Sequence, residues 1–339
     1  MDTKSVIIDT TTHTEIVQSL SEKLKAHYVF PDVAEQICQH LQKHLEGGEY
    51  TNITQGELLA TILTGHIREL NQDKHLIVRW YPELLPSCEG PLQQSQEWLD
   101  EWHQRAEFDN FGLHKVERLP GNVGYLDIRE FYDPSWGGNT AVAAMNFLAN
   151  TNIVIVDLRK CRGGDPDMVA LISSYVFGGK RIHLNSFCWR EQNITEQYWT
   201  QPYIPGKHFG DKPIYVLTSK DTFSGGEEFA YNLKTRQRAI LVGETTGGGA
   251  HIGSPYRIHS HFEVFIPNGR PVNPITGANW EGSGVTPDIS IPQEQAFEVA
   301  YSMALKLIKT SLGKSLSGPV KGFAEEVQTA LKDLETPNW

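Results

Sequence analysis

The stretch Ile214–Tyr231 reads IYVLTSKDTFSGGEEFAY, and its periodicity changes in the middle. The first five residues are apolar and rich in β-branched side chains, a pattern that predicts a buried strand. From Gly225 onward the apolar residues take helical spacing, and two glutamates occupy the first turn, where the helix dipole favours acidic side chains. Ser224 is therefore predicted to lie at a strand–turn–helix junction, directly before two glycines.

A serine in this setting suits nucleophilic catalysis. Glycines let a substrate carbonyl approach the backbone closely, and the N–H groups at a helix start can stabilise a developing negative charge. Gly225 is the expected donor on this side. The alternative is that Ser224 only caps the helix, since serine is a preferred N-cap residue.

Composition limits the classes of function. The 339 residues include 41 acidic and 30 basic side chains, and this net charge of −11 argues against a nucleic-acid partner. No apolar run is long enough for a membrane span, and Met1–Thr14 has no signal-peptide pattern. The cysteines are scattered without a CxxC pair, as in a reducing compartment, so the expected location is the cytoplasm. They are Cys38, Cys88, Cys161 and Cys188.

Helical spacing predicts an N-terminal bundle with helices over about 13–46, divided at Pro31, and over about 55–70. A strand over 76–80 follows the turn that carries His75, and 82–118 contains an amphipathic helix over about 94–106. Further on, strands over 123–128, 153–158, 214–218 and 239–243 alternate with helices, the first of them over 139–148, which indicates an α/β domain. The predicted divisions are an N-terminal helical domain, a linker with one helix, a core and a C-terminal helical segment. Their ranges are 1–80, 81–121, 122–292 and 293–339.

A second glycine pair, Gly163–Gly164, follows the strand that ends in Asp157-Leu158-Arg159. Two glycine turns on neighbouring strands would direct two backbone N–H groups at one point, which is how an oxyanion hole is built. The alternative is that this pair only makes a tight turn.

Five elements in the same order resemble the S41 peptidases, the tail-specific or C-terminal-processing serine peptidases. Within that family they resemble the branch of interphotoreceptor retinoid-binding protein and tricorn protease. The elements are DKHL at 73–76, DLRKCRGG at 157–164, TFSGGE at 222–227, VGETTG at 242–247 and EGSGVTPD at 281–288. The resemblance implies a ClpP/crotonase-like spiral core of ββα units over 122–292, with an N-terminal helical domain.

The resemblance also implies roles for particular residues. Ser224 matches the nucleophile, His75 the general base, and Glu281 the acid that orients the base. The implied oxyanion donors are Gly225 together with Gly163 or Gly164.

Two positions depart from the family pattern. The tail-specific branch has a basic lysine after its Thr-x-Gly element, whereas this chain continues as Gly247-Gly248-Gly249-Ala250-His251. His251 therefore competes with His75 as the base, and otherwise is a candidate substrate contact. Cys161 stands where asparagine is common in the family and is the other candidate contact.

Two functions compete. One is a cofactor-free serine peptidase acting on peptides or unfolded chains, and related assemblies make a homo-oligomer an expectation. The other is a non-catalytic carrier of apolar ligands, as in the retinoid-binding branch. Serine, histidine and glutamate at all three family positions favour the hydrolase. A zinc site at His251, His259 and His261 is less favoured, because no cysteine or aspartate nearby completes a ligand set, so no metal is expected.

Overall fold

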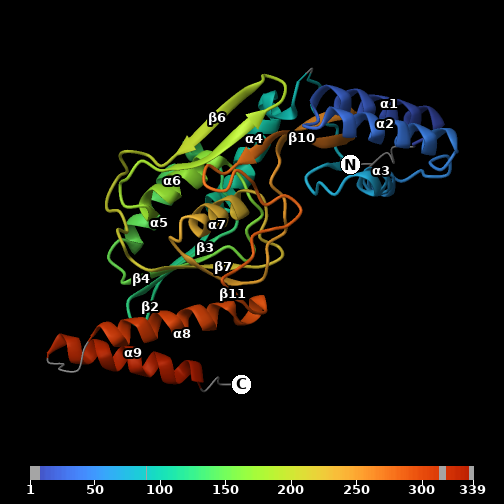
Figure 1. Ribbon diagram of the computed structural model, residues 1–339. Coiled ribbons are helices and arrows are strands. Elements are labelled where there is room, and N and C mark those ends of the chain that lie inside the picture. Colours follow the sequence, from blue (N-terminus) through green and yellow to red (C-terminus); the bar gives the residue numbers. More distant parts are fainter. Residues whose placement is uncertain (1–7, 89, 313–317, 336–339) are drawn as a thin grey trace. The chain divides into compact units, whose positions relative to one another are not determined.

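The computed structural model describes residues 8–88, 90–312 and 318–335, so half of the stretch Met1–Thr14 lies outside them (Figure 1). Two compact units are present. The first contains the described residues up to Gln104 together with 187–196 and 251–272. The second contains 105–186, 197–250 and the described residues from Asn273 onward. Each unit thus combines segments that are distant in the sequence.

The first unit begins with three helices, α1 (Thr10–His27), α2 (Pro31–Glu46) and α3 (Gly56–Leu70). Pro31 is the first residue of α2, where a missing N–H breaks no helical hydrogen bond. The predicted division at Pro31 and the predicted third helix are confirmed. Short helix η1 (Leu92–Gln94) and helix α4 (Gln96–Phe108) follow, and α4 confirms the predicted amphipathic helix.

The helices of the first unit pack on antiparallel strands. Strand β10 (Phe262–Val272) pairs with both β1 (Ile77–Trp80) and β9 (Ile252–His259). The same sheet reaches the ends of β5 (His183–Trp189) and β6 (Ile194–Trp199) that belong to this unit. Apolar residues of α1–α3 share one core with residues of β1, β9 and β10. Strand β9 is not foreseen from the sequence.

A six-stranded sheet forms the centre of the second unit, in the order β11-β8-β7-β4-β3-β2. The pairs from β3 to β11 are parallel, and β2 is antiparallel to β3. Every residue of β4 and β7 is buried, as expected of parallel strands covered on both faces. The strands are β2 (Leu113–Leu119), β3 (Val123–Ile128), β4 (Ile153–Asp157), β7 (Ile214–Thr218), β8 (Ile240–Gly243) and β11 (Ile289–Ser290).

Helices cover both faces of this sheet (Figure 1). One face carries α5 (Pro134–Leu148), α6 (Pro166–Val176) and α7 (Gly225–Thr235), and the other carries α8 (Gln293–Ser311) and α9 (Pro319–Glu335). A separate apolar core fills each side. The α/β class predicted for this region is confirmed. None of the helices described is both long and apolar enough to cross a membrane.

Two local differences from the sequence prediction have physical causes. Helix α5 begins five residues before its predicted start, because Asp133 accepts the Ser135 N–H at 2.7 Å and Pro134 occupies the first helical position. Residues 113–119, which lie in the expected linker, form β2, an edge strand with mostly exposed side chains. Its sequence, LHKVERL, therefore lacks an apolar run. Helix η2 (Asn110–Gly112) precedes it.

Candidate active site

Ser224 lies in the turn between β7 and α7, with a backbone φ of 52° and ψ of −120°. An N-cap residue normally has an extended backbone, and a positive φ is uncommon for a residue with a side chain. Such a conformation costs on the order of 1–3 kcal/mol and is found mainly at functional sites. The predicted strand–turn–helix junction is confirmed, and its strained backbone is more than a helix cap requires.

Buried Glu227 holds this turn in place. Its carboxylate accepts the Ser224 N–H at 3.0 Å and the Thr246 hydroxyl at 2.5 Å. It also accepts the N–H groups of Gly248 and Gly249 at 2.6 and 2.8 Å. Burial raises the pKa of Glu227 to about 7, and these hydrogen bonds oppose the rise. Glu227 thus joins the start of α7 to the glycine run that follows β8.

The Glu227→Gln variant is expected to be less stable. The amide nitrogen would replace an acceptor oxygen and leave buried N–H donors unsatisfied, at about 1–3 kcal/mol for each donor. Because burial raises the pKa of Glu227 above its unfolded value, the carboxyl stabilises the fold most below pH 4.5 and loses that contribution as the pH rises through about 7.

Urea denaturation at pH 5 and pH 8 checks both statements. The difference in the free energy of unfolding between the wild type and Glu227→Gln should be smaller at pH 8 than at pH 5. The control is Glu294→Gln, an exposed acid in the first turn of α8. Equal stability of Glu227→Gln and this control would refute the role given to Glu227.

The two predicted glycine turns lie against each other. Gly163 and Gly164 follow β4, the parallel neighbour of β7, with φ of 127° and 121°, values open mainly to glycine. A Cβ added to Gly163 would lie 2.6 Å from the Ser224 Cβ and 3.0 Å from its Oγ. A Cβ on Gly225 would lie 3.0 Å from the Gly164 carbonyl oxygen. As the first residue of α7, Gly225 has an N–H without an acceptor inside the helix.

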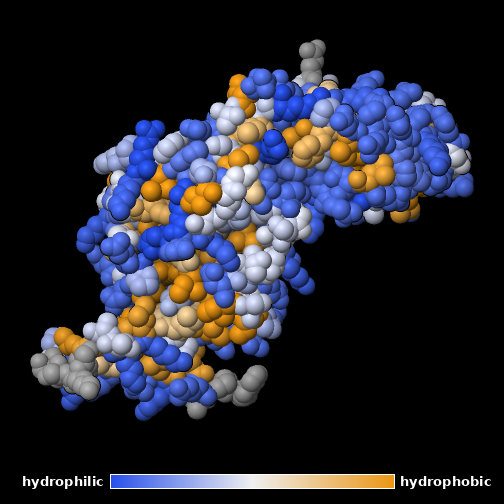
Figure 2. Space-filling view, in the orientation of Figure 1, coloured by the Kyte–Doolittle hydropathy of each residue, from blue (hydrophilic) through white to orange (hydrophobic). Residues whose placement is uncertain are grey.

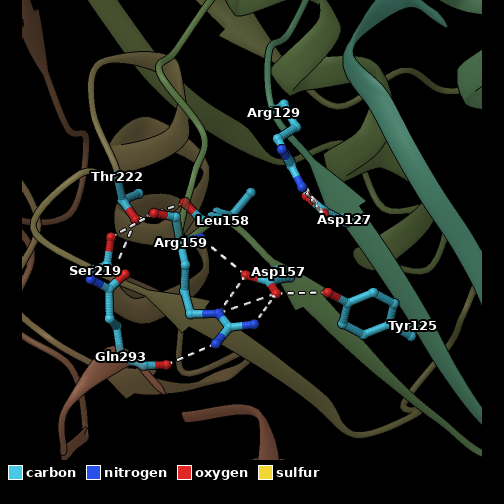
Figure 3. Close-up of polar contacts among 9 residues, drawn as sticks. All are labelled: Tyr125, Asp127, Arg129, Asp157, Leu158, Arg159, Ser219, Thr222 and Gln293. Carbon is cyan, nitrogen blue, oxygen red and sulfur yellow. Dashed lines mark hydrogen bonds and ion pairs between the residues drawn. The ribbon is translucent and has the colours of Figure 1, made fainter. Parts of the chain in front are cut away.

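Polar contacts fix the two strand ends that carry these turns (Figure 3). The carbonyl oxygens of Leu158 and Arg159 accept hydrogen bonds from the hydroxyls of Thr222 and Ser219, at 2.8 and 2.6 Å. The Arg159 guanidinium in turn donates to Asp157 at 2.6 Å. The Asp-Leu-Arg element therefore serves as a frame that holds the Gly163 turn against the Ser224 turn.

Glu281 lies at the end of the glycine run. Its Oε2 accepts the Ala250 N–H at 2.6 Å, and the neighbouring Trp280 donates its indole N–H to the Gly249 carbonyl at 2.8 Å. These contacts place the Glu281 carboxylate beside the residue that precedes His251 in the chain.

Cys161 is fully buried. A Cβ built on Gly226 would lie 3.0 Å from its sulfur, and the Phe223 N–H donates to its carbonyl oxygen at 3.0 Å. Burial raises the pKa of the Cys161 thiol far above its ordinary value. The side chain therefore packs beneath the start of α7 and has no surface for the substrate contact considered from the sequence.

In the first unit, Asp73 contacts both candidate bases. Its Oδ1 accepts the backbone N–H of His75 at 3.0 Å, while Nδ1 of His251 lies 2.7 Å from Oδ2. The Tyr28 hydroxyl donates to the same Oδ2 at 3.3 Å. Asp73 and His251 are both buried. The carboxylate thus shapes the turn that carries His75 and orients the ring of His251.

The ring of His75 lies beside Phe265, with 5.9 Å between the ring centroids. Burial lowers the pKa of His75 to about 4, although the negative charge of Asp73 opposes this. His75 is therefore neutral at pH 7, the protonation state that a general base requires.

The three histidines considered as a zinc site do not come together. Nε2 of His259 lies 3.7 Å from Glu15, and Nδ1 of His261 lies 3.0 Å from the carbonyl oxygen of Tyr81. Both histidines flank the turn between β9 and β10, whereas His251 contacts Asp73.

Comparison with known proteins identifies the family. Residues 122–291 match the model of peptidase family S41, and this match spans half of the chain. The chain belongs to peptidase family S41. Residues 2–101 match the N-terminal domain of peptidase S41 in eukaryotic IRBP, the interphotoreceptor retinoid-binding protein. Both matches agree with the family and the branch that the sequence elements resemble.

Solved structures share the fold at low sequence identity. A putative peptidase from Parabacteroides merdae has a TM-score of 0.58 at 16% identity, over 86% of this chain and 96% of that one. A lipoprotein from Streptococcus agalactiae has a TM-score of 0.57 at 14% identity, over 87% and 96%. The tricorn protease has a TM-score of 0.52 at 14% identity, over 96% of this chain and 37% of that one.

Two site residues of this S41 chain are not foreseen from its sequence. Glu227 is expected there only as a first-turn acid, although the Ser-x-x-Glu spacing of a capping box was a usable signal. The sequence places Asp73 only in the turn before His75. Its contact with His251 joins residues 178 positions apart, and no local pattern reveals such a pair.

Proposed function

We propose that this S41 chain is a serine peptidase with Ser224 as its nucleophile. The observation that carries the proposal is the strained turn of Ser224 against the Gly163 backbone. Ser224 Oγ attacks the peptide carbonyl carbon, and its proton passes to a histidine. The N–H of Gly225 and that of Gly163 or Gly164 stabilise the oxyanion. The histidine then protonates the departing amine, and water hydrolyses the acyl-enzyme.

His75 is the proposed base, with Glu281 as its orienting acid, as the family resemblance implies. Burial keeps its ring neutral at pH 7, although a pKa lowered to about 4 makes it a weaker base than an ordinary histidine. His251 is the second candidate, since Asp73 contacts its Nδ1 and would leave Nε2 to accept a proton. Peptides or unfolded chains are the proposed substrates, and a homo-oligomer remains a proposal.

A non-catalytic carrier of apolar ligands is the competing function, and the N-terminal match to the retinoid-binding branch favours it. Incubation with a permanently unfolded polypeptide separates the two. The peptidase should release new α-amino groups over many turnovers, and this release should stop in Ser224→Ala. A chain that binds an apolar fluorophore but releases no amino groups would be a carrier.

Gly163→Ala is expected to reduce kcat on the order of 100- to 1,000-fold, the typical effect of losing an oxyanion donor. The added methyl would lie 2.6 Å from the Ser224 Cβ, at a φ that alanine rarely adopts. Gly65→Ala is the control, because a Cβ there meets nothing within 4 Å. Normal turnover by a folded Gly163→Ala variant would show that this glycine serves only to form the turn.

A further inference from the structure

Histidines and glutamates gather on the bundle of the first unit. His40 and His44 lie one turn apart on α2, which places their rings on one face of the helix. His66 and Glu69 lie three residues apart on α3, and Glu49 is in the turn after α2. The surface of this bundle is largely hydrophilic (Figure 2). The active-site proposal uses none of these side chains.

Three of these side chains bring their donor atoms to one point. Nε2 of His40 lies 3.1 Å from Nε2 of His44 and 2.7 Å from Oε2 of Glu69. Two imidazoles that ligate one zinc ion at about 2.0–2.1 Å have nitrogens a little more than 3 Å apart, since the geometry is tetrahedral. The spacing of these two nitrogens thus suits a shared metal ion.

Polar and aromatic side chains surround the ring of His44. Its Nδ1 lies at an ion-pair distance of 2.7 Å from Oε1 of Glu49, but the two atoms form no hydrogen bond. The ring of His66 stacks on that of His44, with centroids 3.7 Å apart, and Nδ1 of His66 lies 2.8 Å from the Tyr50 hydroxyl. The other ring nitrogen of His44, Nε2, faces Nε2 of His40 at 3.1 Å.

Proton counting shows what this arrangement lacks. Nε2 of His40 carries at most one proton, yet it contacts both Nε2 of His44 and Oε2 of Glu69. A divalent cation in place of that proton would bond to all three atoms. Side-chain exposures of 23% for His40 and 17% for His44 leave solvent a route to the cluster.

We propose that His40, His44 and Glu69 form a binding site for a divalent transition metal of the zinc class. Imidazole and carboxylate ligands suit zinc, and three protein ligands leave a coordination position for water. Glu49 would position His44, as carboxylates commonly do for metal-bound histidines. The ion would link α2 to α3. The second group, His44 with Glu49 and His66, is less compact, because Nε2 of His66 lies 3.8 Å from Glu49.

The test uses the full chain after treatment with a chelator. Titration with Zn²⁺ in a calorimeter should show one equivalent bound, and Co²⁺ should give the visible absorption of a four-coordinate ion. His40→Gln, His44→Gln and Glu69→Gln should each weaken Zn²⁺ binding by more than the roughly 10- to 100-fold that is typical of residues that only orient a ligand. Glu49→Gln should fall within that smaller range.

His114→Gln is the matched control, since this histidine is exposed on β2 of the second unit. Zn²⁺ should raise the melting temperature of the wild type and of this control but not that of His40→Gln. The side chain of Glu69 is 55% exposed, so Glu69→Gln should fold and keeps the test valid if a histidine variant misfolds. Absence of stoichiometric Zn²⁺ binding, or binding that survives both His40→Gln and Glu69→Gln, would overturn the proposal.

Discussion

Ser224→Ala is expected to abolish peptide hydrolysis, with kcat/KM falling on the order of 10⁴- to 10⁶-fold, as when the nucleophile of a serine peptidase is removed. The hydroxyl oxygen forms the acyl-enzyme bond, and alanine has no atom that can replace it. Serine and the alanine that replaces it both carry a Cβ, so the strained φ at position 224 is the same for both. Loss of the helix cap costs at most about 2 kcal/mol. The variant should therefore stay folded.

Hydrolysis of an unfolded polypeptide and urea denaturation, run on the same preparations, check this expectation. Ser290→Ala provides the control, because Ser290 is exposed at the end of β11. It should keep both its activity and its stability. Undiminished turnover by Ser224→Ala would contradict the proposed mechanism, whereas loss of stability alone would indicate only a structural role.

His75→Ala is expected to lower kcat/KM on the order of 10⁴-fold, while His251→Ala should mainly raise KM. Adding Glu281→Gln to His75→Ala should cost little more, because residues that act as a unit are not additive. Steady-state kinetics of the three single variants and the double variant measure this. If His251→Ala were inactive and His75→Ala only mildly affected, His251 would be the general base and Asp73 the acid that orients it.

The pH profile provides a second comparison of the two histidines. A base works when deprotonated, so activity rises as the pH passes its pKa. Because burial lowers the pKa of His75 to about 4, the rise in kcat/KM should be complete by about pH 6. An unperturbed histidine would place that rise near pH 6.5. A rise that persists in His75→Ala and disappears in His251→Ala would contradict the assignment.

The sequence predicts those parts of the fold whose causes are local. Pro31 marks the start of α2, and the buried run 214–218 followed by glycines marks the junction at Ser224. Strand β2 is not predicted, because its mostly exposed side chains form no apolar pattern in the sequence. Strand β9 includes Gly253 and Pro255, residues that are uncommon within strands.

The sequence predicts the chemistry of the candidate site better than its supporting contacts. Ser224, Gly163 and Gly225 are found from local patterns, and the structure places them together. The contacts of Glu227 with the glycine run span about 20 residues, and those of Asp73 with His251 span far more. Contacts of this kind depend on how strands are ordered in space, which residue spacing does not specify.

Mapping of a fluorophosphonate adduct tests the central claim most directly. The probe forms a bond to an activated serine oxygen, and proteolysis followed by mass spectrometry identifies the modified residue. The account predicts one adduct per chain, on Ser224, with no labelling of Ser224→Ala and unchanged labelling of Ser290→Ala. An unlabelled wild-type chain that nevertheless cleaves peptides, or an adduct on another serine, would contradict it.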